Sequence, residues 1–242
     1  MIDGYIITME GDEYSEQKAQ ECSNSIVDTN SSVHVHTHRA TTPRTLKADM
    51  LDLFGKELPY TWPSKGVVTI DNVHQILQQG YSTDNYASIS ACTISHARLW
   101  SKCLAKNEPI LILEHDAVFT RQFQPQELFR KGFNRGAIAL NDPRGATRRA
   151  GFYHMVVSEK LGISSIPDTD QQEIVPPAQG LPGNSAYVIT PELAGMLLDK
   201  LPHLGIWPND ALMCRQLFPN LLYCYYPYFT KVNQSRSTSQ GR

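Results

Sequence analysis

The feature that most restricts the fold of this chain is a continuous apolar run, Ile110 to Leu113, which follows a proline and ends abruptly in charged residues. An uninterrupted run of this kind is typical of a strand that is buried on both faces of a parallel sheet. The clearest helix is predicted just before it, at residues 90–106, where apolar side chains recur at helical spacing. A buried strand that follows an amphipathic helix indicates an α/β fold.

The rest of the chain also alternates between the two kinds of element. Further strands are predicted at residues 4–8, 33–36, 67–70, 137–140, 155–158 and 186–189, and further helices at 15–24, 191–201 and 209–218. Thr190 and Pro191 have the residue types of an N-cap and a first helical position. Residues 166–183, rich in proline and glycine, are predicted to form a long loop, and loops of that length are often lids or binding elements. This order favours an α/β sheet over a sandwich or a bundle.

The composition excludes several classes of protein. With 22 basic and 24 acidic residues, the chain has no electrostatic footprint for nucleic acid, so no nucleic-acid partner is expected. Residues 1–8 lack the features of a signal peptide, and the longest apolar run is too short to form a transmembrane segment. The five cysteines are scattered and form no CxxC pair, which favours free thiols in a reducing compartment. We therefore expect a cytoplasmic protein.

The acids at the end of the apolar run are the first candidate site. Glu114, His115 and Asp116 follow the predicted strand directly, at the edge of an α/β sheet where ligands bind. Glu114 and Asp116 are two residues apart, so on a continuing strand they share a face. Carboxylate oxygens in this arrangement suit Mn²⁺ or Mg²⁺, which also binds the phosphates of a substrate. The alternative is that the acids cap the following turn or pair with a surface arginine.

Two neighbouring segments, Ile89 to Trp100 and Pro109 to Val118, resemble glycosyltransferase family 25, which includes lipooligosaccharide galactosyltransferases and collagen galactosyltransferase domains. The shared pattern is a helix start of small residues, a Ser-His pair, an aromatic residue about four positions later, and an apolar strand that ends in acids. Later segments fit the family's Gly-x-x-Ala-Tyr strand, its late aspartate and its closing Pro…Gln…Ser segment; these are residues 183–190, Asp210, and residues 226–235. The resemblance extends from about Tyr86 to Ser237.

The resemblance implies a GT-A-type fold, a Rossmann-like mixed α/β sheet flanked by helices. Residues 1–232 would then form a single domain, and residues 233–242 a polar C-terminal tail. The implied activity is the inverting transfer of a hexose, galactose or glucose, from a UDP-sugar donor to a carbohydrate acceptor, a glycan or a glycolipid. Lipopolysaccharide biosynthesis is the implied process, and Mn²⁺ or Mg²⁺ the implied cofactor.

The same resemblance assigns roles to particular residues. Asp210 is the candidate catalytic base, although at a predicted helix start it could equally complement the helix dipole. Glu114 and Asp116 are the candidate metal ligands. The candidate contacts to the nucleotide-sugar are Thr8, Ser95, His96, Glu114, His115 and Asn184. Without the Ser-His match, His96 would be read as a packed core histidine.

Two departures from the family pattern leave alternatives open. His115 replaces the middle acid of the family's Glu-Asp-Asp triplet, and residues 9–13 contain no arginine. A catalytically degenerate sugar- or nucleotide-binding member of the family is therefore the alternative function. A metal-dependent phosphohydrolase is a second rival.

Three further groups of residues are weaker candidates. The alternating His34, His36 and His38 could bind zinc, but a solvent-facing strand edge is favoured and no site is assigned there. Residues 141–145 could line the cleft or form an ordinary turn. The basic cluster of residues 144, 148 and 149 could meet a phosphate, with solvated surface as the default.

Overall fold

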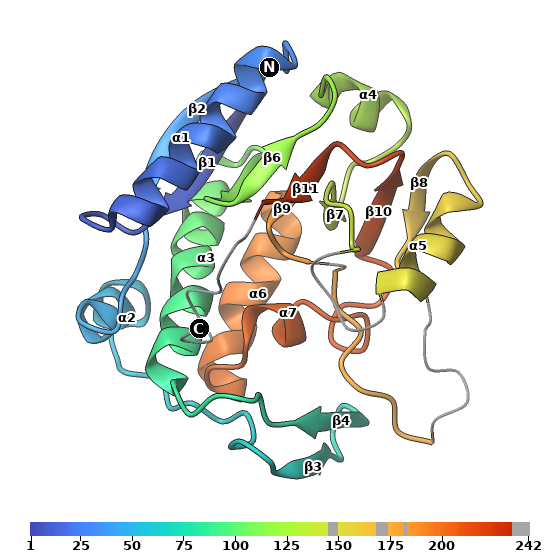
Figure 1. Cartoon of the computed structure of the whole chain (residues 1–242). Helices are drawn as coiled ribbons and strands as arrows, with labels where there is room; N and C mark the ends of the chain where they lie inside the picture. Colours follow the sequence, from blue (N-terminus) through green and yellow to red (C-terminus); the bar gives the residue numbers. More distant parts are fainter. Residues whose placement is uncertain (145–149, 168–173, 182, 234–242) are drawn as a thin grey trace.

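The computed structural model describes residues 1–144, 150–167, 174–181 and 183–233. Its centre is a seven-stranded sheet in the order β2-β1-β5-β9-β7-β10-β8, with helices on both faces (Figure 1). The strands of this sheet are β1 (Ile2–Thr8), β2 (Val33–Arg39), β5 (Ile110–Glu114), β7 (Ala137–Ala139), β8 (Gly162–Ser165), β9 (Ala186–Ile189) and β10 (Leu222–Tyr226). The predicted mixed α/β sheet flanked by helices is confirmed.

The sheet is mixed because β9 and β8 run opposite to the other five strands. β1 pairs in parallel with β2 and with β5, and β7 pairs in parallel with β10. β9 lies antiparallel between β5 and β7, and β8 is antiparallel to β10. The apolar run in β5 therefore has a parallel neighbour on one side and an antiparallel neighbour on the other. The carboxyl ends of β2, β1 and β5 meet at one edge of the sheet.

Alternating side chains of β5 enter two different cores. Ile110 and Ile112 pack in the larger core, with Trp100, whereas Leu111 and Leu113 pack in a second core on the other face. The helices that cover the two faces are α1 (Glu13–Asp28), α2 (Leu46–Phe54), α3 (Tyr86–Lys106), α4 (Pro125–Arg130), α5 (Ala150–Ser158), α6 (Pro191–Leu204) and α7 (Asn209–Leu212). α3 and α6 contribute to the larger core and α1 to the second. Burial on both faces explains why this strand is apolar at every position.

Two small antiparallel pairs lie outside the main sheet. β3 (Val68–Asp71) and β4 (Ile76–Gln79) form a hairpin beside the ends of α3 and α6, and β6 (Ala117–Phe119) pairs with β11 (Thr230–Val232) (Figure 1). The predicted strand at residues 67–70 is thus confirmed, but it does not join the main sheet. Among the helices that the structure describes, none has the length and hydropathy needed to cross a membrane.

The predicted strand at residues 155–158 is wrong, because these residues form the end of α5. Tyr153 and Val157 are the buried positions of this helix, and their spacing of four residues is that of one helical face. The β-branched pair Val156-Val157 suggested a strand, but packing of this face outweighs that local preference. The strand of this region follows at β8.

The predicted helix at residues 209–218 stops after four residues, at Leu212. The backbone N–H of Arg215 donates to the carbonyl of Gln179, and Cys214 forms an isolated bridge with Gly180. These bonds to the 177–180 segment replace those that would continue the helix. Of the predicted tail at 233–242, residues 234–242 lie outside the described residues. They include Gln234 and Ser235 of the segment that resembles the family's closing Pro…Gln…Ser.

Candidate active site

A pocket opens at the edge where β1, β2 and β5 end. The strand register brings the ends together, since Thr8 lies beside Arg39 and Ile7 beside Glu114. Four chain segments line the pocket, one after each of these strands and one from α3. The lining residues are Ile7, Met9, Ala40, Thr41, Thr42, Pro43, Ser88, Ala91, Cys92, Ser95, His96, Glu114, His115 and Asp116.

The acid motif occupies a turn, which corrects the expectation of a continuing strand. β5 ends at Glu114 and β6 begins at Ala117, so His115 and Asp116 form the connection between them. Glu114 and Asp116 therefore do not share a face through strand alternation. They reach the same pocket because the chain turns between them.

The two carboxyl groups of this turn have different environments. Burial, and to a smaller extent the charge of Glu114, raises the pKa of Asp116 to about 7. Its Oδ1 atom is buried and has no hydrogen-bond partner among the described residues. Burial would also raise the pKa of Glu114, but the hydrogen bond with His96 opposes this effect, and the pKa lies below its usual range. Near neutral pH, Glu114 carries the charge and Asp116 is poised to lose its proton.

His96 connects Glu114 to the core through a chain of hydrogen bonds. Its Nε2 lies 3.4 Å from Oε1 of Glu114, and its Nδ1 lies 2.8 Å from the hydroxyl of Tyr187. Trp100 donates its indole N–H to the same hydroxyl at 3.0 Å. The arrangement in which Tyr187 donates to Nδ1 leaves the proton of His96 on Nε2, facing the carboxylate. His96 is therefore both a core histidine and a pocket residue, and it orients Glu114.

Removal of the Tyr187 hydroxyl tests this chain. Tyr187→Phe is expected to lower the free energy of unfolding by about 1–3 kcal/mol, because buried nitrogens of Trp100 and His96 lose their partner. Urea denaturation of the variant and the wild type measures the difference. Tyr223→Phe, which removes an exposed hydroxyl that donates to the carbonyl of Asn220, is the control and is expected to change stability by less. Equal stability of wild type and Tyr187→Phe would contradict the chain of hydrogen bonds.

Ser95 shapes the pocket through the segment that follows β2. Its hydroxyl accepts the backbone N–H of Thr41 at 2.8 Å and donates to the carbonyl of Ala91 at 2.8 Å. The same segment is fixed by the buried Asp49, which accepts hydrogen bonds from Arg39 at 2.8 Å and from the Thr41 hydroxyl at 2.7 Å. Ser95 is thus a positioning residue for a wall of the pocket.

Ser95→Ala is expected to leave the buried N–H of Thr41 without a partner and to lower the free energy of unfolding by about 1–3 kcal/mol. Urea denaturation measures this loss, and ligand titrations measure any loss of affinity at the pocket. Ser158→Ala, which removes an exposed hydroxyl at the end of α5, serves as the control. An unchanged stability in Ser95→Ala would show that the hydroxyl does not hold the segment.

His115 also contributes to the pocket, although it replaces an acid of the family pattern. Its Nδ1 lies 3.2 Å from the hydroxyl of Ser15, which itself accepts the N–H of Met9 at 2.9 Å. The Ser15 proton is then free to bond Nδ1, which places the imidazole proton on Nε2. Burial lowers the pKa of His115, and Nε2 has no partner among the described residues. A neutral His115 therefore presents an unused N–H donor beside the acids.

Cys92 also lies near these groups, since its Sγ and ligand atoms of His96 and Glu114 lie within 4.8 Å of one another. Burial raises the pKa of the Cys92 thiol well above its usual range, and the charges of Glu114, Asp210 and Asp116 raise it further. A protonated thiol is a poor metal ligand. Carboxylates remain the stronger candidates.

Thr8 and Asn184 are not among the residues that line the pocket. The Thr8 hydroxyl donates back to the carbonyl of Ile6 at 3.2 Å, although its neighbours in sequence do line the pocket. Asn184 is buried, and its Oδ1 has no partner among the described residues. The carbonyl of the next residue, Ser185, accepts the N–H of Glu114 at 2.8 Å, so Asn184 lies close to the end of β5.

Asp210 is the second residue of α7 and is not among the residues that line this pocket. Its Oδ1 accepts the hydroxyl of Tyr81. Although solvent reaches Asp210, desolvation by the surrounding protein raises its pKa, against the Tyr81 hydrogen bond, and the charge of Glu114 contributes to the increase. The structure thus brings Asp210 within electrostatic range of the acid turn.

Sequence reasoning missed several residues near these groups. Residues 40–43 follow a predicted strand, so the rule that ligands bind at strand ends would have found them. Ser88 and Cys92 lie eight and four residues before His96, on its helical face. No sequence signal marks Gly180, where a Cβ atom would lie 2.1 Å from the backbone oxygen of Asp210.

The secondary candidates that the structure describes, residues 141–144, do not line the pocket. Asp142 pairs with Arg144 at 2.6 Å, and the amide of Asn141 donates to the carbonyl of Asp142 at 2.8 Å. These contacts favour the interpretation of an ordinary turn. The candidates Arg148 and Arg149 lie outside the described residues.

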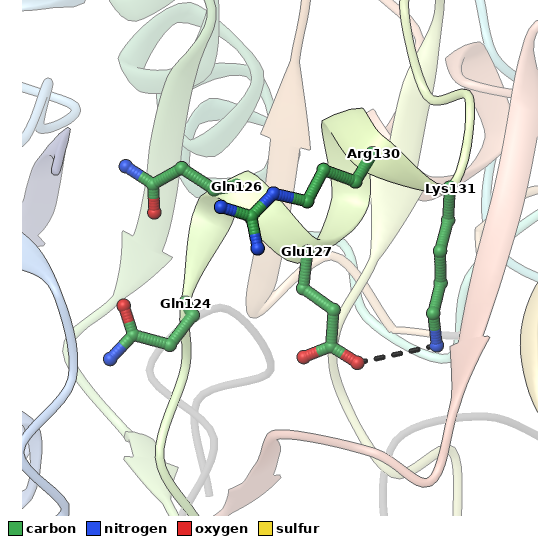
Figure 2. A pocket seen from close by; sticks show the side chains of 5 residues that line it. All are labelled: Gln124, Gln126, Glu127, Arg130 and Lys131. Carbon is green, nitrogen blue, oxygen red and sulfur yellow. Dashed lines mark ion pairs between the residues drawn. The ribbon is translucent and has the colours of Figure 1, made fainter.

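A second hollow, on α4, is not a candidate site. Its lining residues are Gln124, Gln126, Glu127, Arg130 and Lys131 (Figure 2). Glu127 and Lys131 pair with each other at 3.3 Å, and Lys131 also donates to the hydroxyl of Tyr225 at 2.7 Å. None of the predicted site residues lies there. Two of its charged side chains, Glu127 and Lys131, are thus already paired within the protein.

The acid-lined pocket at the end of a mixed α/β sheet and the family match together define the class of protein: it is a glycosyltransferase, which takes a sugar donor and an acceptor. The model of glycosyltransferase family 25, described as an LPS biosynthesis protein family, matches residues 86–213, more than half of the 242 residues. The chain belongs to glycosyltransferase family 25.

Individual proteins give weaker matches to this chain than the family model does. No curated protein matches the chain. The apo crystal structure of mouse xyloside xylosyltransferase 1 has a TM-score of 0.46 and 12% identity, covering 91% of this chain and 84% of that one. A putative glucose-1-phosphate thymidylyltransferase from Bacillus anthracis, in complex with sucrose, has a TM-score of 0.41 and 10% identity, covering 93% and 86%. Neither likeness supports an inference about this chain.

Proposed function

We propose that this GT-A-type glycosyltransferase moves a hexosyl group, galactose or glucose, from a UDP-sugar to a carbohydrate acceptor with inversion, using Mn²⁺ or Mg²⁺. The observation that carries the proposal is the buried carboxyl of Asp116, whose unpartnered Oδ1 belongs to the same pocket as the charged Glu114. Without a cation, the buried Asp116 beside the half-buried, charged Glu114 destabilises the fold, because burial and the charge of Glu114 both oppose the ionisation of Asp116. Such a pair is favourable where a cation and a phosphate group bind.

The residues present fit a hard divalent cation. Carboxylate oxygens are the ligands that Mg²⁺ and Mn²⁺ prefer, and Glu114 and Asp116 would hold the ion. The bound cation would stabilise the charge that develops on the leaving diphosphate. His96 orients Glu114 from behind, and the N–H at Nε2 of His115 offers a donor to an anionic oxygen where an acid would repel it.

Asp210 is the proposed general base. Tyr81 occupies its Oδ1, so Oδ2 would accept the proton of the acceptor hydroxyl. The acceptor oxygen attacks the anomeric carbon from the face opposite the diphosphate, the bond from carbon to the diphosphate oxygen breaks, and UDP leaves. The raised pKa of Asp210 supports this role, since a general base works best with a pKa near the operating pH.

Ligand-dependent thermal stability tests the donor site. A ligand that binds only the folded protein raises the melting temperature. UDP or one UDP-hexose is expected to do so in the presence of Mn²⁺, and UDP release is then expected to increase when a carbohydrate acceptor is added. The absence of any shift would overturn the proposal.

The same assays separate the alternatives. A shift without turnover would identify the degenerate binding protein, for which the histidine at position 115 is the motivation. Phosphate release from simple esters without an acceptor would identify a phosphohydrolase. We further propose a cytoplasmic location, because all five cysteines are free thiols.

A further inference from the structure

A second group of metal-binding side chains lies at the amino end of β1 and β2. Oδ1 of Asp3 lies 3.1 Å from Nδ1 of His34 and 3.3 Å from Nε2 of His36. The three ligand atoms all lie within 4.8 Å of one another. The sequence alone shows alternating histidines without a nearby carboxylate, and the pairing of β1 with β2 brings Asp3 to them.

Strand pairing explains why these side chains converge. His34 and His36 are two residues apart on β2, so they project from the same face, and the parallel register sets Asp3 directly beside His34. The ring of Tyr5 stacks on His36 at 4.9 Å and fixes its orientation. His38 is the third alternating histidine but does not take part, because it is buried near Arg98 and its pKa is lowered to about 4 by burial.

The distances suit a tetrahedral ion. Zinc binds histidine nitrogen and carboxylate oxygen at about 2.0–2.1 Å, so neighbouring ligand atoms of a tetrahedron lie about 3.3 Å apart. The separations of Asp3 Oδ1 from the two histidine nitrogens, 3.1 Å and 3.3 Å, lie close to this value. We propose that Asp3, His34 and His36 bind one Zn²⁺ ion, with water in the fourth position.

The surroundings of Asp3 favour this geometry. Lys106, at the end of α3, pairs with Oδ2 of Asp3 and leaves Oδ1 directed at the two histidines. A fixed partner on the second oxygen is the usual way in which proteins orient a carboxylate ligand. The side chain of His34 is 65% exposed, so an ion can enter from solvent. Zinc would connect the edge strand β2 to β1 at this end of the sheet.

The proposed zinc site is separate from the acid turn. Asp3 lies four residues before Ile7, which is the residue of β1 that pairs with Glu114. At about 3.3 Å per residue of strand, the two groups are about 13 Å apart. A substitution in one group can therefore be made without touching the other.

Zinc titration by isothermal calorimetry, on the full chain at pH 7.5, tests the site. The double variant Glu114→Ala/Asp116→Ala serves as the background, because it removes the other acids that could take Zn²⁺. In this background one equivalent of Zn²⁺ is expected to bind. Adding His34→Ala or Asp3→Asn is expected to weaken that binding at least tenfold, and circular dichroism checks that each variant is folded.

His74→Ala is the matched control, since His74 pairs with Asp71 at 2.7 Å and belongs to no group of three metal-binding side chains among the described residues. This variant is expected to bind Zn²⁺ as the background does. Absorption of Co²⁺ in place of Zn²⁺ gives an independent readout of the coordination, which is expected to be lost in His34→Ala. The proposal is overturned if the background binds no Zn²⁺, or if neither His34→Ala nor Asp3→Asn weakens the binding.

Discussion

Asp116→Asn is expected to abolish the Mn²⁺-dependent rise in melting temperature given by UDP or a UDP-sugar, while making the ligand-free protein more stable above pH 7. The variant keeps the shape of the side chain but removes one proposed metal ligand and its charge. Ligand affinity and intrinsic stability are thus expected to change in opposite directions, which ordinary damage to the fold does not produce.

The pH dependence of this effect follows from the pKa of Asp116, which rises from 3.8 to about 7 on folding. Between these values the folded protein binds more protons than the unfolded chain, so the wild type loses stability as the pH increases. Below 3.8 the carboxyl is protonated in both states and the effect vanishes. Above pH 7 the wild type has the full loss of folding stability, which is at most about 4 kcal/mol.

Chemical denaturation between pH 5 and 8, with and without Mn²⁺ and UDP, measures both changes. Because the cation competes with the proton, the stabilisation by Mn²⁺ and UDP is expected to grow over this range in the wild type. Asp199→Asn, an exposed acid on α6, is the control and is expected to behave as the wild type. A variant Asp116→Asn that keeps the Mn²⁺-dependent shift would contradict the assignment of Asp116 as a ligand.

Asp210→Asn is expected to lower kcat for the proposed transfer by about 10²–10⁴-fold, the usual contribution of a general base, with little change in the affinity for the donor. Steady-state assays of UDP release and calorimetric titration of the donor separate the two quantities. Glu192→Gln, an exposed acid at the start of α6, is the control. If Asp210→Asn keeps most of the wild-type kcat, another group must accept the proton.

Tyr81→Phe provides a finer test of the same assignment. The hydrogen bond from Tyr81 lowers the pKa of Asp210, so its removal is expected to raise that pKa. A general base must be deprotonated, and the acidic limb of the pH–kcat profile is therefore expected to move to higher pH. An unchanged pH–kcat profile would show that Tyr81 does not affect the pKa of the general base.

Much of the fold could be predicted where one local signal dominates. The apolar run of β5 and the spacing of α3 each indicate burial without knowledge of their neighbours, and both elements are confirmed. Local signals failed in α5, where Val156-Val157 suggested a strand although Tyr153 and Val157 mark a buried helical face. α7 is shorter than predicted because bonds to the 177–180 segment, remote in sequence, replace its own.

The site could be predicted only in part, for a related reason. Ser95, His96 and the acid turn were recognisable because they lie close together in sequence and follow a strand or helix pattern. Tyr81 reaches Asp210 across 129 residues of chain, and nothing in its own segment marks it. The hydrogen-bond chain from Trp100 through Tyr187 likewise depends on side chains from α3 and β9 that only the folded sheet brings together.

Gly180 has no reactive group, yet its small size is needed for the position of the proposed base, Asp210. It has no side chain, and even a methyl group there would press on the backbone of Asp210. Because a backbone oxygen cannot turn aside as a flexible side chain can, a substitution requires the backbone at Gly180 or at Asp210 to shift. A screen of random variants for loss of sugar transfer would then score Gly180 as intolerant, although it lends no atom to the reaction. Selection for activity would therefore act against substitutions of Gly180, because they disturb the position of Asp210.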